Sequence, residues 1–388
     1  MSAQNICMSQ SCAMEARQAV EEFHSAVAQP NMELVVFFCS SEYDLDELAA
    51  EMNRLFAGIQ VVGCTTAGEI GPAGYHQHSL SGASFPAGSC VAVSGLLDRL
   101  SQFDIARGHD FAQTLLQRLE SRVPQAGPDN SFAFMLIDGL SVREEPVAHA
   151  LQYALGKIPL IGGSAGDDQR FAKTFVYSDS RFHSDSTALI LINTSLPFRV
   201  FKTQHFVPTD KRLIVTEADT ARRIVKEING LPAAEEYARL VDVEVHELNP
   251  MRFAASPVVV VINGIDYVRS IQKANPDGSL TFFCAIEEGL VLRVAHGLDL
   301  VNNLEQTFDR IREEIGPPQL VFGCDCILRN LEIIQNGLKD RVEEILQRNN
   351  TIGFSSYGEQ FRGIHVNQTL TGIAIGTNPE PIRKVRDA

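Results

Sequence analysis

The stretch Gly63-Cys64-Thr65-Thr66-Ala67-Gly68-Glu69 has a counterpart near the other end of the chain, Gly353-Phe354-Ser355-Ser356-Tyr357-Gly358-Glu359. Both stretches follow a short apolar run, and both read Gly, any residue, two hydroxyl residues, any residue, Gly, Glu. Glycine permits positive φ and close backbone approach, while the hydroxyls, amides and carboxylate supply hydrogen-bonding groups. The pattern therefore predicts either a loop that holds a small polar ligand or a tight turn at the end of a strand.

A third glycine-rich loop, Gly162-Gly163-Ser164-Ala165-Gly166-Asp167-Asp168, lies between these two. None of the three loops has the Gly-Lys-Ser/Thr ending of a phosphate loop or the GxGxxG dinucleotide pattern, so nucleotide binding is unsupported. The candidate ligand-binding residues are Gly63, Thr65, Thr66, Gly68, Glu69, Gly163, Ser164, Gly166, Asp167, Ser355, Ser356, Tyr357, Gly358 and Glu359.

Helical and strand-like patterns alternate along the chain, which predicts an α/β fold of the mixed α+β kind. The expected helices are 11–28, 45–56, 111–119, 144–155, 298–315 and 328–348, and the expected strands include 33–39, 59–63, 90–97, 132–137, 258–262 and 352–354. We also expect residues 174–177 and 187–192 to form a hairpin, and Asn275-Pro276-Asp277-Gly278 to be the turn of another. Within 213–240, two helical segments are expected on either side of Asn229-Gly230-Leu231-Pro232.

The length of 388 residues suits two domains. We expect an N-terminal helix in residues 1–29, a first domain over 30–225 and a second over 226–388, each a mixed sheet with flanking helices. No low-complexity linker separates the two domains, so they are expected to pack tightly.

The net charge of −15 argues against binding to nucleic acid or to an anionic membrane, because phosphate attraction needs clustered cations. No apolar run approaches the length of a membrane span, and the N-terminus lacks the pattern of a signal peptide. The eight cysteines are expected to be reduced and mostly buried, which favours a cytoplasmic location.

Several stretches resemble the FIST sensory family: residues 61–70, 158–168, 248–253, 267–271, 275–284 and 353–376. The resemblance implies an N-terminal and a C-terminal FIST domain over about residues 30–225 and 226–375. It also implies a sensor that binds a small ligand and acts on a histidine kinase or a cyclic-di-GMP enzyme. A member without an output domain is similar to the haem-containing, nitric-oxide-sensing branch of the family, so haem b is the implied cofactor.

Haem needs an axial ligand, most often His, in an apolar pocket. No Cys-x-x-Cys-His occurs, so any haem would be held non-covalently. The candidate ligands are His183, beside aromatic residues, His205, in an apolar stretch, and His365, within a stretch that resembles the family. For each of them a structural role is the competing interpretation.

Cys324 and Cys326 stand two apart on an expected strand, so both thiols face one side. They suggest an alternative, a zinc or thiol redox sensor, although core packing would explain them equally.

A further alternative is an amino-acid-like ligand on the glycine loops. We do not expect an enzyme: the match of 162–166 to GxSxG lacks the following helix, and Glu69 and Glu359 could each serve their own turn. The sequence leaves the oligomeric state open, with a dimer plausible.

Overall fold

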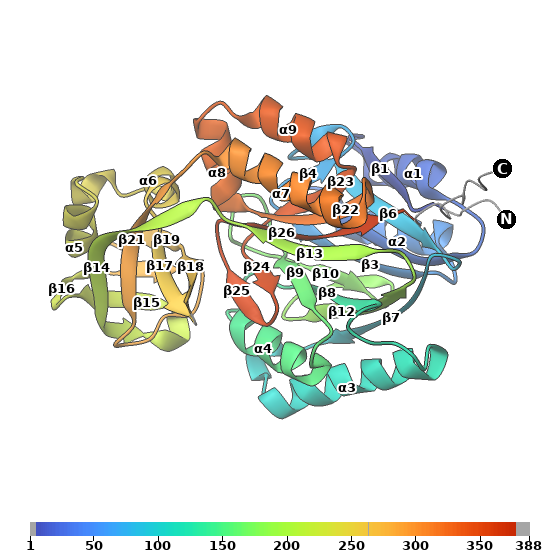
Figure 1. Ribbon diagram of the computed structural model, residues 1–388, viewed down its shortest axis with the longest axis horizontal. Coiled ribbons are helices and arrows are strands. Elements are labelled where there is room, and N and C mark those ends of the chain that lie inside the picture. The colour runs from blue at the N-terminus through green and yellow to red at the C-terminus, as the bar shows by residue number, and fades with distance from the viewer. Residues whose placement is uncertain (1–4, 263, 378–388) are drawn as a thin grey trace, which may run out of the picture.

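The computed structural model describes residues 5–262 and 264–377, which form a large body and a smaller inserted domain (Figure 1). The body contains three six-stranded sheets, and the inserted domain contains a fourth sheet. Helices flank the sheets, which mix parallel and antiparallel pairs. The predicted mixed α/β class is confirmed.

Three segments of the chain build the body, and each runs strand, helix, strand, helix, strand, hairpin, strand, with a pair of helices at the second helix position of the third segment. The first contains β1 (Cys7–Ser11), α1 (Ala16–Val27), β2 (Met32–Ser40), α2 (Leu45–Leu55), β3 (Gln60–Thr66), β4 (Glu69–Gly71), β5 (Gly74–His76) and β6 (Leu80–Pro86). The second contains β7 (Cys90–Leu97), α3 (Ile105–Arg122), β8 (Ser131–Ile137), α4 (Glu144–Leu155), β9 (Leu160–Ser164), β10 (Val176–Ser178), β11 (Arg181–His183) and β12 (Thr187–Thr194). The third contains β13 (Phe198–Thr203), α7 (Leu300–Ile315), β22 (Pro318–Cys326), α8 (Ile327–Gln335), α9 (Lys339–Arg348), β23 (Thr351–Ser356), β24 (Glu359–Phe361), β25 (Ile364–Val366) and β26 (Leu370–Gly376).

The three segments exchange their hairpins in a ring. The strand orders are β1-β6-β2-β3-β10-β11, β7-β12-β8-β9-β24-β25 and β13-β26-β22-β23-β4-β5. In each sheet the two central strands are parallel, and the last two strands are a hairpin supplied by another segment. Because each hairpin completes the sheet of a neighbour, no segment forms its sheet alone. The predicted tight packing of the two halves follows, since strands from both halves share sheets.

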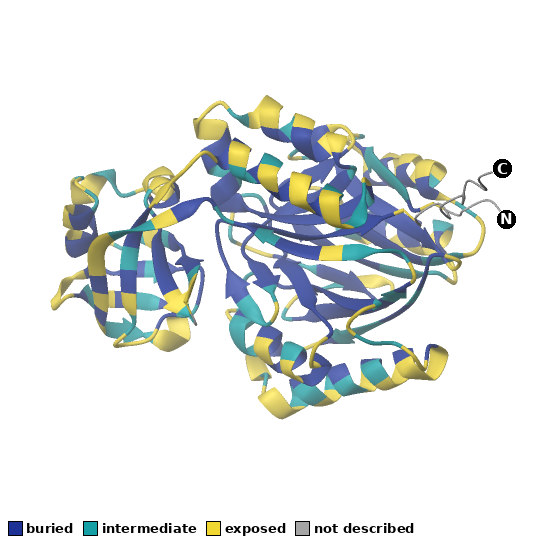
Figure 2. Ribbon diagram, in the orientation of Figure 1, coloured by how far each residue is buried: buried dark blue, intermediate teal, exposed yellow. Residues whose placement is uncertain are grey.

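The inner faces of the three sheets pack against one another, and helices cover their outer faces. At the centre, Phe38 of β2, Phe134 of β8 and Phe322 of β22 meet with ring centroids 5.3–6.4 Å apart. Figure 2 shows this interior as continuously buried strands beneath helices that are exposed on one side. Burial of these faces from water supplies the main favourable term for folding.

The inserted domain lies between β13 and α7. It contains β14 (Phe206–Asp219), β15 (Ile224–Ile228), β16 (Leu231–Pro232), α5 (Ala233–Leu240), α6 (Pro250–Ala255), β17 (Val258–Ile262), β18 (Ile265–Arg269), β19 (Ile271–Ala274), β20 (Leu280–Phe282) and β21 (Val291–Gly297). Its apolar core also takes in Val366 of β25, so the last hairpin of the body packs against the inserted domain. The boundary predicted between residues 225 and 226 falls within β15.

The expected hairpin of 174–177 with 187–192 is wrong. Asp179 and Ser180 both adopt positive φ, so they form the tight turn of a shorter hairpin between β10 and β11. The strand after them, β12, pairs instead with β7 and β8 in another sheet. The polar stretch between 177 and 187 is therefore not one long turn, because Asp and Ser tolerate the left-handed conformation and form a tight turn within it.

Two predicted helices also differ in the structure. The first helical segment within 213–240 is a strand, because Leu213 and Val215 are buried while Ile214 is exposed, which is the alternation of a strand. The second segment is confirmed as α5. The helix expected over 328–348 is two helices, α8 and α9, with Gly337 in the left-handed conformation between them. The hairpin turn at 275–278 is confirmed by the pairing of β19 with β20.

Candidate functional site

The three glycine loops meet where the three sheets join, and they bond to one another in a ring. The amide of Ala67 donates to the carbonyl of Ser355 (2.9 Å), and that of Gly166 donates to the carbonyl of Thr65 (3.0 Å). The amide of Tyr357 donates to the carbonyl of Ser164 (3.2 Å). The sequence echo thus marks equivalent positions of a threefold arrangement.

All the candidate ligand-binding residues on these loops are buried. Thr65, Ser164 and Ser355 have no exposed surface. The hydroxyl of Thr65 accepts a hydrogen bond from the amide of Phe175 (3.0 Å). The loops therefore form the junction of the body rather than the wall of an open pocket. Ligand binding directly on them, including an amino-acid-like ligand, stays a prediction.

Glu69 and Glu359 each hold their own loop closed. Glu359 accepts from the hydroxyls of Ser356 and Thr369, both at 2.6 Å. Glu69 accepts in the same way from Thr66 and from the hydroxyl of Ser79. Burial raises the pKa of Glu359 to about 8 and that of Glu69 well above its usual range. Glu69 lies on β4 and Glu359 on β24, in different sheets, so each serves its own turn.

The second glycine loop continues outward from this junction. Asp167 accepts from the amides of Ala172 and Lys173, both at 2.8 Å, and from the hydroxyl of Tyr357. Phe171 stacks on the ring of Tyr357 with centroids 4.5 Å apart. The loop thereby fixes Phe171 at the surface of the body that faces the inserted domain.

A cavity of about 610 Å³ lies at this boundary between the body and the inserted domain. The body contributes Phe171 and the loop before α4, and the inserted domain contributes Phe283 and several cations. Three lining residues other than glycine have left-handed backbone: Val142 (φ 56°), Phe171 (φ 50°) and Arg223 (φ 56°). For a β-branched residue such as Val142 this conformation is strained, and strain of this kind concentrates at functional sites.

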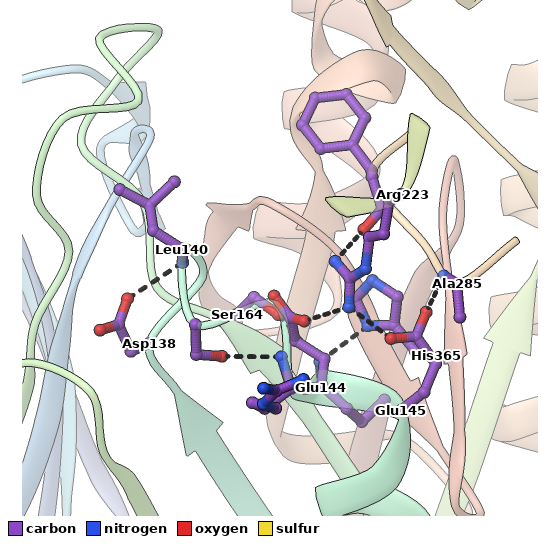
Figure 3. A network of polar contacts seen from close by, with 12 residues as sticks. Asp138, Leu140, Glu144, Glu145, Ser164, Arg223, Ala285 and His365 are labelled. Carbon is purple, nitrogen blue, oxygen red and sulfur yellow. Dashed lines mark hydrogen bonds and ion pairs between the residues drawn. The ribbon is translucent and has the colours of Figure 1, made fainter. Parts of the chain in front are cut away.

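Arg223 joins the inserted domain to the body through buried contacts (Figure 3). Its Nη2 atom lies 2.5 Å from Oε2 of Glu144 and also contacts Glu145, and its Nη1 atom donates to the carbonyl of Phe283 (2.6 Å). Burial raises the pKa of Glu144 to about 7 despite this cation. Oε1 of Glu145 in turn accepts from the amide of Ala285, at 2.5 Å.

The remaining cations that line the cavity are Arg170, Arg222 and Lys273. Arg170 is paired with Glu42. Arg222 and Lys273 are exposed, and across residues 5–262 and 264–377 neither has a carboxylate within ion-pair distance. Both cations line the cavity, to which they bring positive charge.

The three histidines proposed as haem ligands lie in three separate places. Nε2 of His183 bonds the carbonyl of Ser178 at the tip of the β10–β11 hairpin (3.1 Å). Nε2 of His205 is buried and lies 2.8 Å from Glu332 of α8.

His365 is buried in the network of Figure 3, where Nε2 of Gln360 lies 3.1 Å from its Nδ1 atom and donates to the hydroxyl of Ser164 (2.9 Å). Its Nε2 atom has no hydrogen-bond partner, but a Cβ placed on Gly358 would lie only 2.5 Å from that atom. Burial lowers the pKa of His365 to about 4. The ring is therefore packed against backbone on that side, and these histidines do not fit a haem.

Cys324 and Cys326 are both 1% exposed, and burial raises the pKa of each thiol well above its usual range. Among the described residues, no cluster of three or more His, Cys, Asp or Glu side chains could hold a metal ion. A buried thiol with a raised pKa is a poor nucleophile and a poor metal ligand. The zinc or redox site stays a prediction that this arrangement does not favour.

Sequence reasoning missed Arg222, Arg223, Lys273 and Phe283. The stretch that contains Arg222 and Arg223 has a helical pattern, so the sequence predicts no loop there. One sequence feature does indicate this region: the third glycine-rich loop continues through a polar run that ends at Phe171, a residue that lines the cavity.

A closed α/β body that carries a second domain, with a charged cavity at their boundary, is a typical construction for a ligand-binding protein. The chain belongs to the FIST family: the FIST N domain model matches residues 33–231 and the FIST C domain model matches residues 233–362. FIST domains are signalling sensor domains that bind small ligands.

The chain is similar to an uncharacterised protein of Methanocaldococcus jannaschii, with 23% identity over 391 residues, which covers 87% of this chain and 73% of that protein. A solved structure of a cyanuric acid hydrolase matches with a TM-score of 0.33 and 11% identity, over 76% of this chain and 99% of the hydrolase. Among the described residues, no helix combines the length and apolarity needed to cross a membrane.

Proposed function

We propose that the protein is a sensor that binds a small ligand between its body and its inserted domain and thereby regulates a histidine kinase. The observation that carries this proposal is the cavity of about 610 Å³ at the boundary, to which both parts contribute side chains. A ligand that touches both parts has different affinity for different relative positions of the two, and only such a difference can shift a conformational equilibrium.

The connections between body and inserted domain suit a hinge. The chain crosses between them at residues 203–206 and again at 297–300, and the amide of Leu298 donates to the carbonyl of His205 (2.8 Å). His205 is in turn bonded to Glu332 of α8. The two short crossings are thus tied to each other and to a helix of the body. Movement of the inserted domain would reach α8 through this contact.

A kinase partner places the proposed action in the cytoplasm, and the described cysteines, all free thiols, suit that compartment. The haem and nitric-oxide part of the prediction rests on the resemblance alone. None of the residues lining the boundary cavity is a His, Cys, Met or Tyr, so this cavity offers no axial ligand.

The test uses purified histidine kinases from the source organism, whose initial rates of autophosphorylation are measured with and without the full chain. We expect the rate of one kinase to change severalfold, and Arg223→Gln, which removes a contact between the two parts, to alter that effect. Arg212→Gln, a charge-matched change on the exposed surface of the inserted domain, is the control. If no kinase responds to the wild-type chain, the proposal is contradicted.

A further inference from the structure

The boundary cavity combines free positive charge with aromatic rings. We propose that it binds a small ligand in which a carboxylate or phosphate group is joined to a flat apolar group. This inference rests on the proposed function, because it names the chemical class of ligand that the sensor detects.

Arg222 and Lys273 form the anion-binding side. Both belong to the inserted domain, both line the cavity, and in the described part of the chain neither is neutralised by a carboxylate. A guanidinium and an ammonium group together can give charge-assisted hydrogen bonds to the oxygens of one carboxylate or phosphate.

Phe171 and Phe283 form the apolar side. Their ring centroids lie 5.8 Å apart at an interplanar angle of 48°, one ring coming from the body and the other from the inserted domain. Phe171 is backed by Tyr357, on which it stacks. A flat ligand that contacts both rings therefore bridges the two parts of the protein.

The lining is already held in place before a ligand binds. Arg223, whose guanidinium is occupied by Glu144 and Glu145, fixes the backbone that carries Arg222. Asp167 accepts two amides at 2.8 Å and so fixes the loop that carries Phe171. Such preorganisation lowers the entropic cost of binding.

Isothermal titration calorimetry of the full chain tests the proposal with four probes. Phenyl phosphate and benzoate carry both features, inorganic phosphate carries only the anion, and benzamide carries only the flat ring. We expect phenyl phosphate or benzoate to bind at least about tenfold more tightly than inorganic phosphate and benzamide. Which of the two binds better distinguishes a phosphate ligand from a carboxylate ligand.

Variants place the binding in this cavity. We expect Arg222→Gln and Lys273→Gln each to weaken binding of the better probe by about tenfold or more, because each removes a charge-assisted hydrogen bond. Phe171→Leu should weaken phenyl phosphate but leave any binding of inorganic phosphate unchanged. Arg212→Gln is the charge-matched control, and circular dichroism confirms that each variant is folded.

The proposal is overturned if none of the probes binds, if inorganic phosphate or benzamide alone binds as tightly as the combined probes, or if Arg212→Gln weakens binding as much as Arg222→Gln. These results are independent of any kinase. Failure of the probes together with a responding kinase would reject only the ligand class. Binding of the probes without a responding kinase would reject only the proposed function.

Discussion

Arg223 of the inserted domain and Glu144 of the body form a buried ion pair, with Nη2 and Oε2 2.5 Å apart (Figure 3). The two side chains are 7% and 2% exposed, so little solvent screens them. Glu145 contacts the same guanidinium, which therefore balances two carboxylates. The pair links the two parts of the molecule, and Arg223 lines the cavity between them.

Removal of Arg223 should destabilise the protein, because it leaves the buried Glu144 and the partly buried Glu145 without this cation. We expect Arg223→Gln to lower the free energy of unfolding at pH 7.5 by about 3 kcal/mol, measured by urea titration. Arg212→Gln should change it by less than about 0.5 kcal/mol. Adding Glu144→Gln to Arg223→Gln should recover part of the loss, and a purely additive double variant would contradict the coupling.

The stability of the protein should depend on pH through Glu359. Its pKa is about 8 in the folded chain against an ordinary 4.5, so between these values the folded state binds a proton that the unfolded state lacks. The stabilisation from this group is therefore complete below about pH 4.5 and is lost as the pH rises toward 8, at up to about 1.4 kcal/mol per pH unit.

Glu359→Gln cannot titrate, so its free energy of unfolding should fall less steeply than that of the wild type between pH 5.5 and pH 8. Urea titrations at several pH values measure the two slopes. The exposed Glu313→Gln serves as the control and should keep the wild-type slope. Parallel slopes for Glu359→Gln and the wild type would exclude this group as the source.

Gly68 and Gly358 occupy equivalent loop positions but should respond differently to alanine. Both have positive φ, at 127° and 156°, yet a Cβ at Gly358 would lie 2.3 Å from the His365 ring, whereas at Gly68 the nearest atom is 3.4 Å away. We expect Gly358→Ala to cost at least about 2 kcal/mol more than Gly68→Ala in urea unfolding. Combining Gly358→Ala with His365→Ala should relieve the clash, and equal costs for the two glycines would argue against this packing.

The thiols should divide into reactive and unreactive groups. Cys12 is exposed and Cys7 is partly exposed, whereas Cys324 and Cys326 are buried. Desolvation raises the pKa of the Cys12 thiol, and burial raises those of Cys324 and Cys326 well above the usual range. With Ellman's reagent at pH 8, the folded protein should lose its fast phase in Cys12→Ser and keep it in Cys326→Ser. A fast phase that depends on Cys326 would instead support the thiol sensor.

Haemin should not find a specific axial ligand among the predicted histidines. Titration of the protein with haemin, followed by absorption spectroscopy, should give no sharp Soret band that is lost in His183→Ala, His205→Ala or His365→Ala, because each ring is bonded or enclosed elsewhere. A sharp band that shifts with nitric oxide and disappears in one of these variants would restore the haem interpretation.

Local patterns in the sequence predicted most elements, because apolar periodicity reports directly which face of a segment is buried. Helix α4 and strand β7 have the predicted bounds. The hairpin prediction was wrong because a short polar turn determines the course of the chain there. Residues 179–180 form the turn of a hairpin, and the hydrophobic pattern does not distinguish such a turn from a loop. The sequence indicates residues of a ligand-binding loop only where a glycine-rich motif occurs, and Arg222 and Lys273 lie on no such motif.

The sequence by itself determined the mixed α/β class, the family and the equivalence of the glycine loops, since composition, periodicity and motif are properties of local stretches of chain. Only the tertiary structure decided that the loops are enclosed and that the hairpins are exchanged among three sheets. It also decided that the cations of residues 222 and 273 line the same cavity as the aromatic ring at 171. The physical reason is that burial and charge balance depend on neighbours far apart in the chain. Glu145 of the body meets Arg223 of the inserted domain, 78 residues away, and no local pattern contains that contact.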